Sequence, residues 1–240
     1  EDAKKRTVTG CVATTMAQIM KYWNFPVSGK GEKTYGHGLY GKLHANFENT
    51  TYDWENMTNE YNQNSSKEEI KAVATLMYHC GVALSMHYGV ETSGTEEHYI
   101  VNSLKTYFMY DNSIKLINRS DYDDNTWTGI LKENLDNHHP MPYAGEANAI
   151  RHSFICDGYD TGGRFHFNLG WNGNSNGYYY IDNITHLELN LDQNVIINIE
   201  PIEELSPQIS LLKPLELKQE VVYQNSNIKI DANIVNNRSK

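Results

Sequence analysis

The sequence predicts an α+β fold, because helical and strand periodicities occupy different parts of the chain. Before Pro140 the apolar residues recur at the spacing of amphipathic helices, and after it they alternate with polar residues at a period of two. Helices grouped ahead of strands are typical of α+β rather than of alternating α/β proteins. With 240 residues, 39% of them hydrophobic, the chain can form one large core or two modest ones.

Four segments carry the helical pattern. They span residues 12–23, 70–80, 95–108 and 125–135. The first begins directly after Cys11 and ends before Pro26, which places this cysteine at the N-terminal edge of a helix. The second follows a Ser66–Glu69 capping box and places Cys80 on its buried face. The polar segment 27–55 shows little periodicity and is predicted to be a long surface loop.

Five segments after Pro140 have the strand pattern, with Gly, Asn and Asp turns between them. They span residues 141–145, 152–159, 164–169, 177–182 and 195–200. The chain then continues through a predicted linker, residues 201–208, into a segment where apolar residues alternate from Ile228 to Ile234. About thirty residues are too few to fold alone. We therefore expect residues 209–240 to be either a tail packed on the main domain or the start of a truncated β-sandwich-like domain.

Charge and composition exclude several classes of protein. The formal charge of -10 has the wrong sign for holding a phosphate backbone, so we expect no nucleic-acid partner. The apolar runs are far shorter than the ~20 residues needed to cross a bilayer, so we expect no membrane span. Three cysteines do not make a disulfide scaffold. No Cys-x-x-Cys or His-Glu-x-x-His pattern is present, and we expect neither a metal site nor a cofactor.

Cys11 has the position of an activated nucleophile. A thiol attacks as thiolate, and the unpaired N–H groups and macrodipole of a helix N-terminus lower its pKa. Gly10 removes a side chain from the approach to the sulfur. A buried structural cysteine at a helix start has the same local sequence, so the prediction depends on a matching base elsewhere in the chain.

His152 is the candidate base. It begins a predicted strand and follows Cys11 by 141 residues, inside the separation of about 130–150 residues noted for papain-type enzymes. The strand period places Cys156 on the same face as His152, so Cys156 is expected in the core. A third group should orient the imidazole. Asn168 is the candidate for this role, with Trp171 close by to shield the hydrogen bond from water.

Six segments of the chain are distinctive in sequence and in order. They are Thr-Gly-Cys-Val-Ala-Thr-Thr-Met-Ala-Gln-Ile-Met-Lys-Tyr-Trp (9–23), Tyr-Asp-Trp (52–54), Met-His-Tyr-Gly (86–89), Ile-Asn-Arg-Ser-Asp (117–121), His152 with its Asp-Gly, and Asn168 to Gly173. Over about residues 7 to 200 they resemble the streptopain family of secreted bacterial cysteine proteases. The resemblance implies a papain-like two-lobed fold, in which a helical lobe packs against an antiparallel β lobe, and peptide-bond hydrolysis by a Cys-His dyad in the cleft between them.

Roles for individual residues follow from the same resemblance. It implies that Cys11 is the nucleophile and that His152 is the base which then protonates the leaving amine. Trp171 matches an indole of the family's Asn-Trp-Gly-Trp-Gly-Gly run, and the backbone of Arg151 would face the substrate. The loop that lines the substrate pocket corresponds to Ser93, Gly94 and Thr95.

Three positions depart from the family's pattern. Arg151 stands where the family often has glycine and adds bulk and charge beside the site. Leu169 replaces the first tryptophan of the Asn-Trp-Gly-Trp run, so we expect weaker orientation and shielding of His152. Lys5 stands six residues before Cys11, where papain-like enzymes often carry a glutamine of the oxyanion hole. Losing one such donor can cost about 10²–10³ in rate.

We therefore expect residues 1–200 to form a papain-like cysteine endopeptidase that hydrolyses protein or peptide substrates through a thioester acyl-enzyme. The expected location is secreted, or at the bacterial cell surface or in the periplasm. An N-terminal pro-segment absent from this chain is an expected partner. Two alternatives lack the chemistry: a degenerate protease-like domain that binds peptides or glycans in a larger surface protein, and an adhesive module that uses a Tyr-rich β surface.

Overall fold

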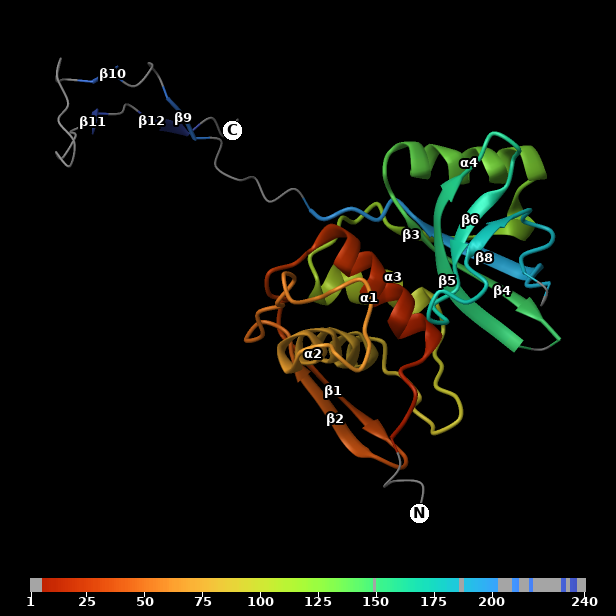
Figure 1. The fold of residues 1–240 in the computed structure, drawn as a ribbon, viewed down its shortest axis with the longest axis horizontal. Coiled ribbons are helices and arrows are strands. Elements are labelled where there is room, and N and C mark those ends of the chain that lie inside the picture. Colours follow the sequence, from red (N-terminus) through yellow and green to blue (C-terminus); the bar gives the residue numbers. More distant parts are fainter. Residues whose placement is uncertain are drawn as a thin grey trace. The chain divides into compact units, whose positions relative to one another are not determined.

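The structure is a computed structural model, which describes residues 6–148, 150–185 and 188–202 together with four short strands beyond them. Contacts divide the chain into two compact units, Glu1–Ile202 and Glu203–Lys240. Figure 1 shows the helices and strands of the first unit.

Helices form at all four predicted places. They are α1 (Cys11–Trp23), α2 (Lys67–Ala83), α3 (His98–Tyr107) and α4 (Asp124–Asp136). The capping box ahead of α2 is confirmed, because the Ser66 hydroxyl accepts from the Glu69 N–H and the Glu69 carboxylate accepts from the Ser66 N–H. Cys80 is fully buried, as predicted.

Strands β4 to β8, which follow Pro140, join β3 in one antiparallel sheet of six strands in the order β3-β8-β4-β5-β6-β7. Their bounds are β3 (Lys115–Asn118), β4 (Met141–Ala147), β5 (Ile150–Tyr159), β6 (Phe165–Asn168), β7 (Gly177–Tyr179) and β8 (Leu191–Ile197). The predicted α+β class is confirmed. The short edge strand β3 was not predicted, because four residues carry too little alternation to be recognised.

The predicted surface loop 27–55 is wrong in its middle part, which forms a β-hairpin. Strands β1 (Glu32–His37) and β2 (Gly41–Asn46) pair antiparallel over their whole length. Tyr35 and Leu43 face each other in this register and pack against the core of the helical lobe. The hairpin was missed because its buried face holds few aliphatic residues, so the hydrophobic pattern is weak.

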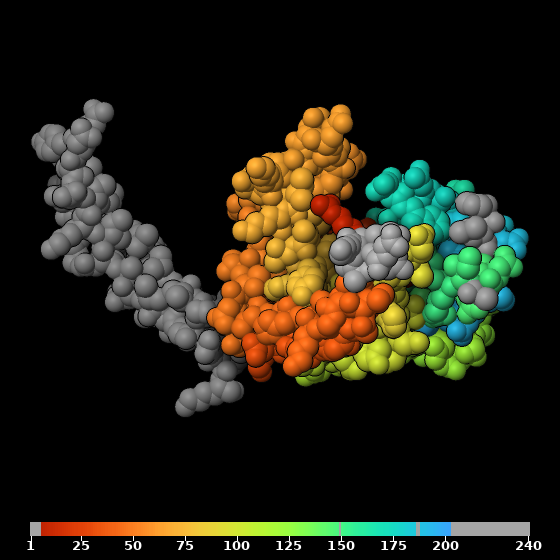
Figure 2. Space-filling model, turned by 90° about the horizontal axis from the view of Figure 1, so that it is seen from below, coloured from red at the N-terminus to blue at the C-terminus, as the bar shows by residue number. Residues whose placement is uncertain are grey.

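Strand β5 lies between two hydrophobic cores and therefore organises the first unit. Ile155 belongs to the core formed with α1, α2 and α3, whereas Phe154 and Cys156 belong to the core formed with α4 and the other strands. Helix α1 packs against β5. Figure 2 shows the start of the described chain, in red, between the segments in orange and yellow and the strands in green to blue. Helix α1 is thus held against β5.

The second unit contains two short antiparallel strand pairs. Strand β9 (Ile209–Leu211) pairs with β12 (Ile234–Asn236), and β10 (Glu216–Leu217) pairs with β11 (Ile230–Asp231). Most of the predicted linker, residues 203–208, and part of the alternating segment around Ile228 lie outside the described residues. The linker and the nature of residues 209–240 stay predictions.

Candidate active site

The backbone at the start of α1 places Cys11 without any side-chain cap. Gly10 has φ +89°, in the region that favours glycine, and makes no side-chain capping bond. Its carbonyl accepts hydrogen bonds from the N–H and the hydroxyl of Thr14, 3.1 and 3.0 Å away. A Cβ at position 10 would lie 2.8 Å from the Ser93 carbonyl oxygen. Glycine is therefore required both by the turn into the helix and by the close approach of the Ser93 loop.

We expect Gly10→Ala to destabilise the protein by about 1–3 kcal/mol, because it combines an unfavourable φ with a backbone clash. Gly31→Ala is the matched control, since Gly31 also has a positive φ (+65°) but open space where its Cβ would lie. Urea unfolding measures both changes. Equal destabilisation of the two variants would contradict the close approach of Ser93 to Gly10.

The thiol of Cys11 is half-buried, and the groups around it shift its pKa in opposite directions. Burial raises its pKa, and the Glu97 carboxylate raises it further, whereas the backbone N–H groups of Ser153, Val12 and Cys11 itself lower it. The expected lowering by the helix start is thus present but is outweighed by burial. The Ser153 N–H, which acts on the sulfur, belongs to the residue directly after His152.

His152 lies in β5 and is nearly buried, at 9% exposed. Its Nε2 is 2.8 Å from the carbonyl oxygen of Leu169, which can only accept, so Nε2 carries the proton and Nδ1 is left as the free base. Burial lowers the pKa of the imidazole, and the bond to Leu169 raises it. The indole of Trp171 stacks on the ring at 4.5 Å between centroids and 20° between planes.

The structure places Cys11 in the first turn of α1, and this helix packs against β5, the strand that carries His152. The sulfur is within the influence of the Ser153 N–H, one residue from the imidazole. Within the residues that the structure describes, no direct hydrogen bond joins the Cys11 sulfur to the His152 ring. The Ser153 N–H, in the residue after His152, is the group of this strand that acts on the sulfur.

Asn168 does not make the contact predicted for it. Its Oδ1 accepts from the N–H of Gly170 at 3.0 Å, in a turn of its own loop. The imidazole is bonded instead to the carbonyl of Leu169, whose side chain is fully buried. A backbone carbonyl thus holds the ring and Trp171 covers it, and the weaker shielding expected from Leu169 in place of a tryptophan stays a prediction.

The predicted substrate loop lies beside Gly10 and is tied to its surroundings by hydrogen bonds. The Ser93 hydroxyl donates to the Val8 carbonyl at 2.7 Å, and Gly94 exchanges two backbone bonds with His87. The Thr95 hydroxyl donates to the Leu84 carbonyl at 3.2 Å. These bonds fix the loop against the start of α1, but its contact with substrate stays a prediction.

Two participants in this site were not predicted from the sequence. One is the Leu169 carbonyl, a backbone group that no residue type identifies. The other is Glu97, directly before α3, which is buried and pairs with Arg151. The only signal that could have found it is Arg151 itself, since a cation next to a buried histidine requires a nearby counter-charge. Lys5, discussed for the oxyanion hole, lies outside the described residues.

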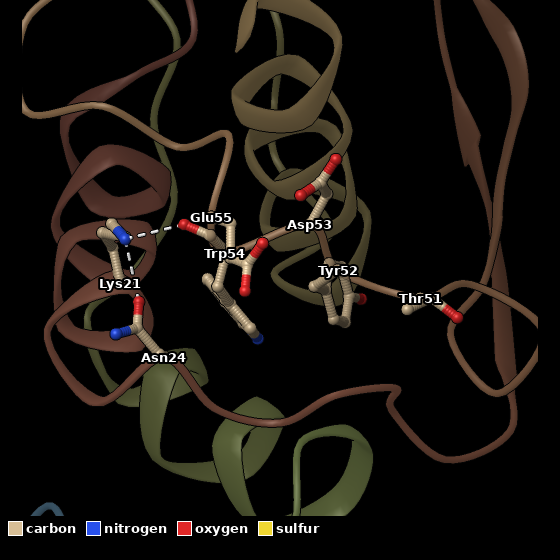
Figure 3. Close-up of a pocket in the computed structure, with 7 residues that line it drawn as sticks. All are labelled: Lys21, Asn24, Thr51, Tyr52, Asp53, Trp54 and Glu55. Carbon is tan, nitrogen blue, oxygen red and sulfur yellow. Dashed lines mark hydrogen bonds between the residues drawn. The ribbon is translucent and has the colours of Figure 1, made fainter. Parts of the chain in front are cut away.

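A separate pocket of about 780 Å³ lies at the other end of α1, about 15 Å along the helix from Cys11 (Figure 3). It is lined by Lys21, Asn24, Thr51, Tyr52, Asp53, Trp54 and Glu55. Lys21 Nζ already donates to the Asn24 side chain and the Trp54 carbonyl, and the Trp54 indole donates to the Pro26 carbonyl. Neither Cys11 nor His152 lines this pocket, so it is distinct from the candidate active site.

Among the described residues, no three His, Cys, Asp or Glu side chains are placed to hold a metal ion. None of the helices in these residues is long and apolar enough to cross a membrane.

A helical lobe on an antiparallel sheet, with a cysteine at the start of a helix that packs against a histidine-bearing strand, is the arrangement of papain-like cysteine peptidase domains. The chain belongs to the Peptidase C10 family, whose profile matches residues 1–179. It is similar to the active interpain A cysteine protease of Prevotella intermedia, with a TM-score of 0.74 and 37% identity over 80% of this chain and 83% of that one.

Curated relatives give the same family. The thiol protease/hemagglutinin PrtT of Porphyromonas gingivalis is 34% identical over 217 residues, which are 85% of this chain and 25% of PrtT. Streptopain of Streptococcus pyogenes is 33% identical over 187 residues, 74% of this chain and 46% of streptopain. The chain thus spans between a quarter and a half of the curated relatives that it matches.

Proposed function

We propose that the chain is a cysteine endopeptidase that hydrolyses peptide bonds through Cys11 and His152. The observation that supports the proposal is a helix-start thiol acted on by the N–H of Ser153, the residue after His152, whose imidazole Nε2 is bonded to the Leu169 carbonyl. This arrangement leaves Nδ1 as a proton acceptor with the protonation state fixed. Membership of a family of peptidases supports the same reaction.

The proposed reaction proceeds through a thioester. His152 Nδ1 accepts the proton of the Cys11 thiol, and the sulfur attacks the scissile carbonyl carbon. The C–N bond breaks as the imidazolium returns that proton to the leaving amine. Water, deprotonated by His152, then attacks the thioester and releases the acid together with the free thiol. Stacking of Trp171 on the imidazole keeps water away from its hydrogen bond with Leu169.

The start of α1 supplies donors for the developing oxyanion. The first N–H groups of a helix have no partner within it, and Cys11 and Val12 are the first two residues of α1. Their N–H groups are directed at the region of the sulfur, because both lower the pKa of the Cys11 thiol. We assign the oxyanion hole to this helix start, with the Cys11 N–H as its main donor.

The test is hydrolysis of casein with and without the thiol alkylator E-64. We expect casein to be cleaved, E-64 to stop cleavage, and mass spectrometry to find the adduct on Cys11. The buried Cys80 and Cys156 serve as internal controls that stay unmodified. An adduct on Cys11 without hydrolysis of any protein would instead support the degenerate, peptide-binding alternative. Hydrolysis that E-64 does not slow would refute the role of Cys11.

The pH dependence of Cys11 alkylation follows from the two pKa shifts. Burial raises the pKa of the thiol and lowers the pKa of His152, so both groups are expected to be uncharged in the free protein at pH 7. The rate with iodoacetamide should therefore still be rising above pH ~8.5, the ordinary thiol pKa. Free cysteine in the same buffers is the control. A rate for Cys11 that levels off below pH 7 would instead reveal a thiolate–imidazolium pair.

The biological setting is part of the proposal. We propose that the protein acts outside the cytoplasm, as a secreted or bacterial surface or periplasmic enzyme on protein substrates, and that its full-length form carries an N-terminal pro-segment. A prointerpain A fragment is similar to this chain, with a TM-score of 0.72 and 38% identity. Cell fractionation of the source bacterium, with an antibody to this domain, tests the location, and recovery in the cytoplasm would refute it.

A further inference from the structure

Arg151 joins the strand that carries His152 to the loop before α3. Its Nε lies 3.1 and 3.0 Å from the two carboxylate oxygens of Glu97. Its Nη1 lies 2.9 Å from the Asp192 carbonyl oxygen and 3.0 Å from a carboxylate oxygen of Asp192. The guanidinium therefore bonds to two acidic residues from different parts of the first unit, directly beside His152.

Glu97 is the member of this group that matters for Cys11. Its side chain is 7% exposed, whereas that of Asp192 is 80% exposed. A buried carboxylate is tolerated only when it is paired, and its field is screened less than that of an exposed one. Glu97 acts on the Cys11 thiol, whose ionisation it opposes after the larger effect of burial. The Glu97 carboxylate thus opposes formation of the Cys11 thiolate, and Arg151 offsets the charge of this same carboxylate.

We infer that Arg151 and Glu97 form a positioning pair, which fixes the His152 end of β5 against the loop before α3 and balances the charge beside Cys11. The inference deepens the proposed function, because it assigns a task to the arginine that departs from the family's usual glycine. The positive charge of Arg151 offsets the negative charge of Glu97, which alone would oppose ionisation of the Cys11 thiol more strongly. Neither residue takes part in a bond-making step.

Among the described residues, the charged or titratable neighbours of the pair along the chain and across the sheet include the exposed Glu96. His152 follows Arg151 in β5, and Glu146 is its cross-strand neighbour in β4. His98, the first residue of α3, follows Glu97 and is exposed. Asp192 in β8 is also exposed. Of the carboxylates in this group, only Glu97 is both buried and in electrostatic contact with the Cys11 thiol.

The experiment measures the pH dependence of iodoacetamide alkylation of Cys11 in Arg151→Gln, in Glu97→Gln and in the double variant. Arg151→Gln leaves the carboxylate uncompensated, so the profile should move to higher pH by at least about half a unit. Glu97→Gln removes the opposing charge and should move it to lower pH by a similar amount. The double variant should return close to wild type. A purely structural role would move both single variants in the same direction.

Arg164→Gln is the matched control, because Arg164 forms an ion pair with Asp160 through Nη2, at 2.6 Å, in the turn between β5 and β6. It should leave the alkylation profile of Cys11 unchanged. Should Arg151→Gln fail to fold in a thermal melt, Glu97→Gln and the double variant still decide the question. A Glu97→Gln profile that matches wild type or moves to higher pH overturns the inference.

Alkylation does not depend on peptidase turnover, so the two proposals can fail separately. Opposite shifts of the two single variants without any hydrolysis of casein by wild type would support the charge pair and refute the proposed function. Hydrolysis of casein with unshifted profiles would support the proposed function and refute the charge pair.

Discussion

Replacing Cys11 with alanine is expected to abolish hydrolysis of casein, with a loss of at least about 10⁴-fold. The variant keeps the helix start and the stacked imidazole but removes the atom that forms the thioester. Because Cys11 is half-buried at the first position of α1 and alanine favours helices, the fold should be retained. Release of soluble peptides from casein measures the loss, and a thermal melt shows whether the variant is folded.

Cys80→Ala is the control for the removal of a thiol as such. Cys80 is fully buried in α2, with its sulfur 3.7 Å from that of Met20, and it takes no part in the site. The variant should lose about 1 kcal/mol of stability and keep its activity. If Cys11→Ala hydrolysed casein as fast as Cys80→Ala, the proposed nucleophile would be wrong.

The elements that the sequence predicted well are those with strong local signals. Helix α2 has both a capping box and a long apolar stripe, and α1 is bounded by Gly10 and by Asn24, whose left-handed conformation ends it. The hairpin β1–β2 was missed because its buried face holds few aliphatic residues, and the four-residue strand β3 was missed because it pairs only with β8, far away in the sequence. Non-local pairing leaves no periodic signal in so short a segment.

In the candidate site, the sequence identifies functional side chains but not functional backbone groups. Cys11, His152 and Trp171 could be proposed from the sequence, because their side chains have specific chemistry at a characteristic spacing. The group that orients the imidazole could not, since it is the carbonyl of Leu169 and every residue has a carbonyl. Glu97 could not be predicted either, because a glutamate before a helix is ordinarily an exposed residue.

The second large effect is expected from His152→Ala, which should slow casein hydrolysis by about 10²–10⁴-fold. The variant removes the proton acceptor for the thiol and the donor to the leaving amine. It also leaves the Leu169 carbonyl without its imidazole partner and removes the ring on which Trp171 stacks. Initial rates over a range of pH distinguish the loss of a base from partial unfolding, since a variant without a base should respond only to the ionisation of the thiol.

Asn168→Ala separates the geometry of this site from the arrangement predicted by sequence. Because the Asn168 side chain bonds to the Gly170 N–H and not to the imidazole, its loss should change the rate by no more than about twofold. An imidazole oriented by Asn168 would instead give a large loss, close to that of His152→Ala. Measured side by side on casein, the two variants therefore decide whether the Leu169 carbonyl alone is enough to hold the proton on Nε2 and leave Nδ1 free to accept the proton of the thiol.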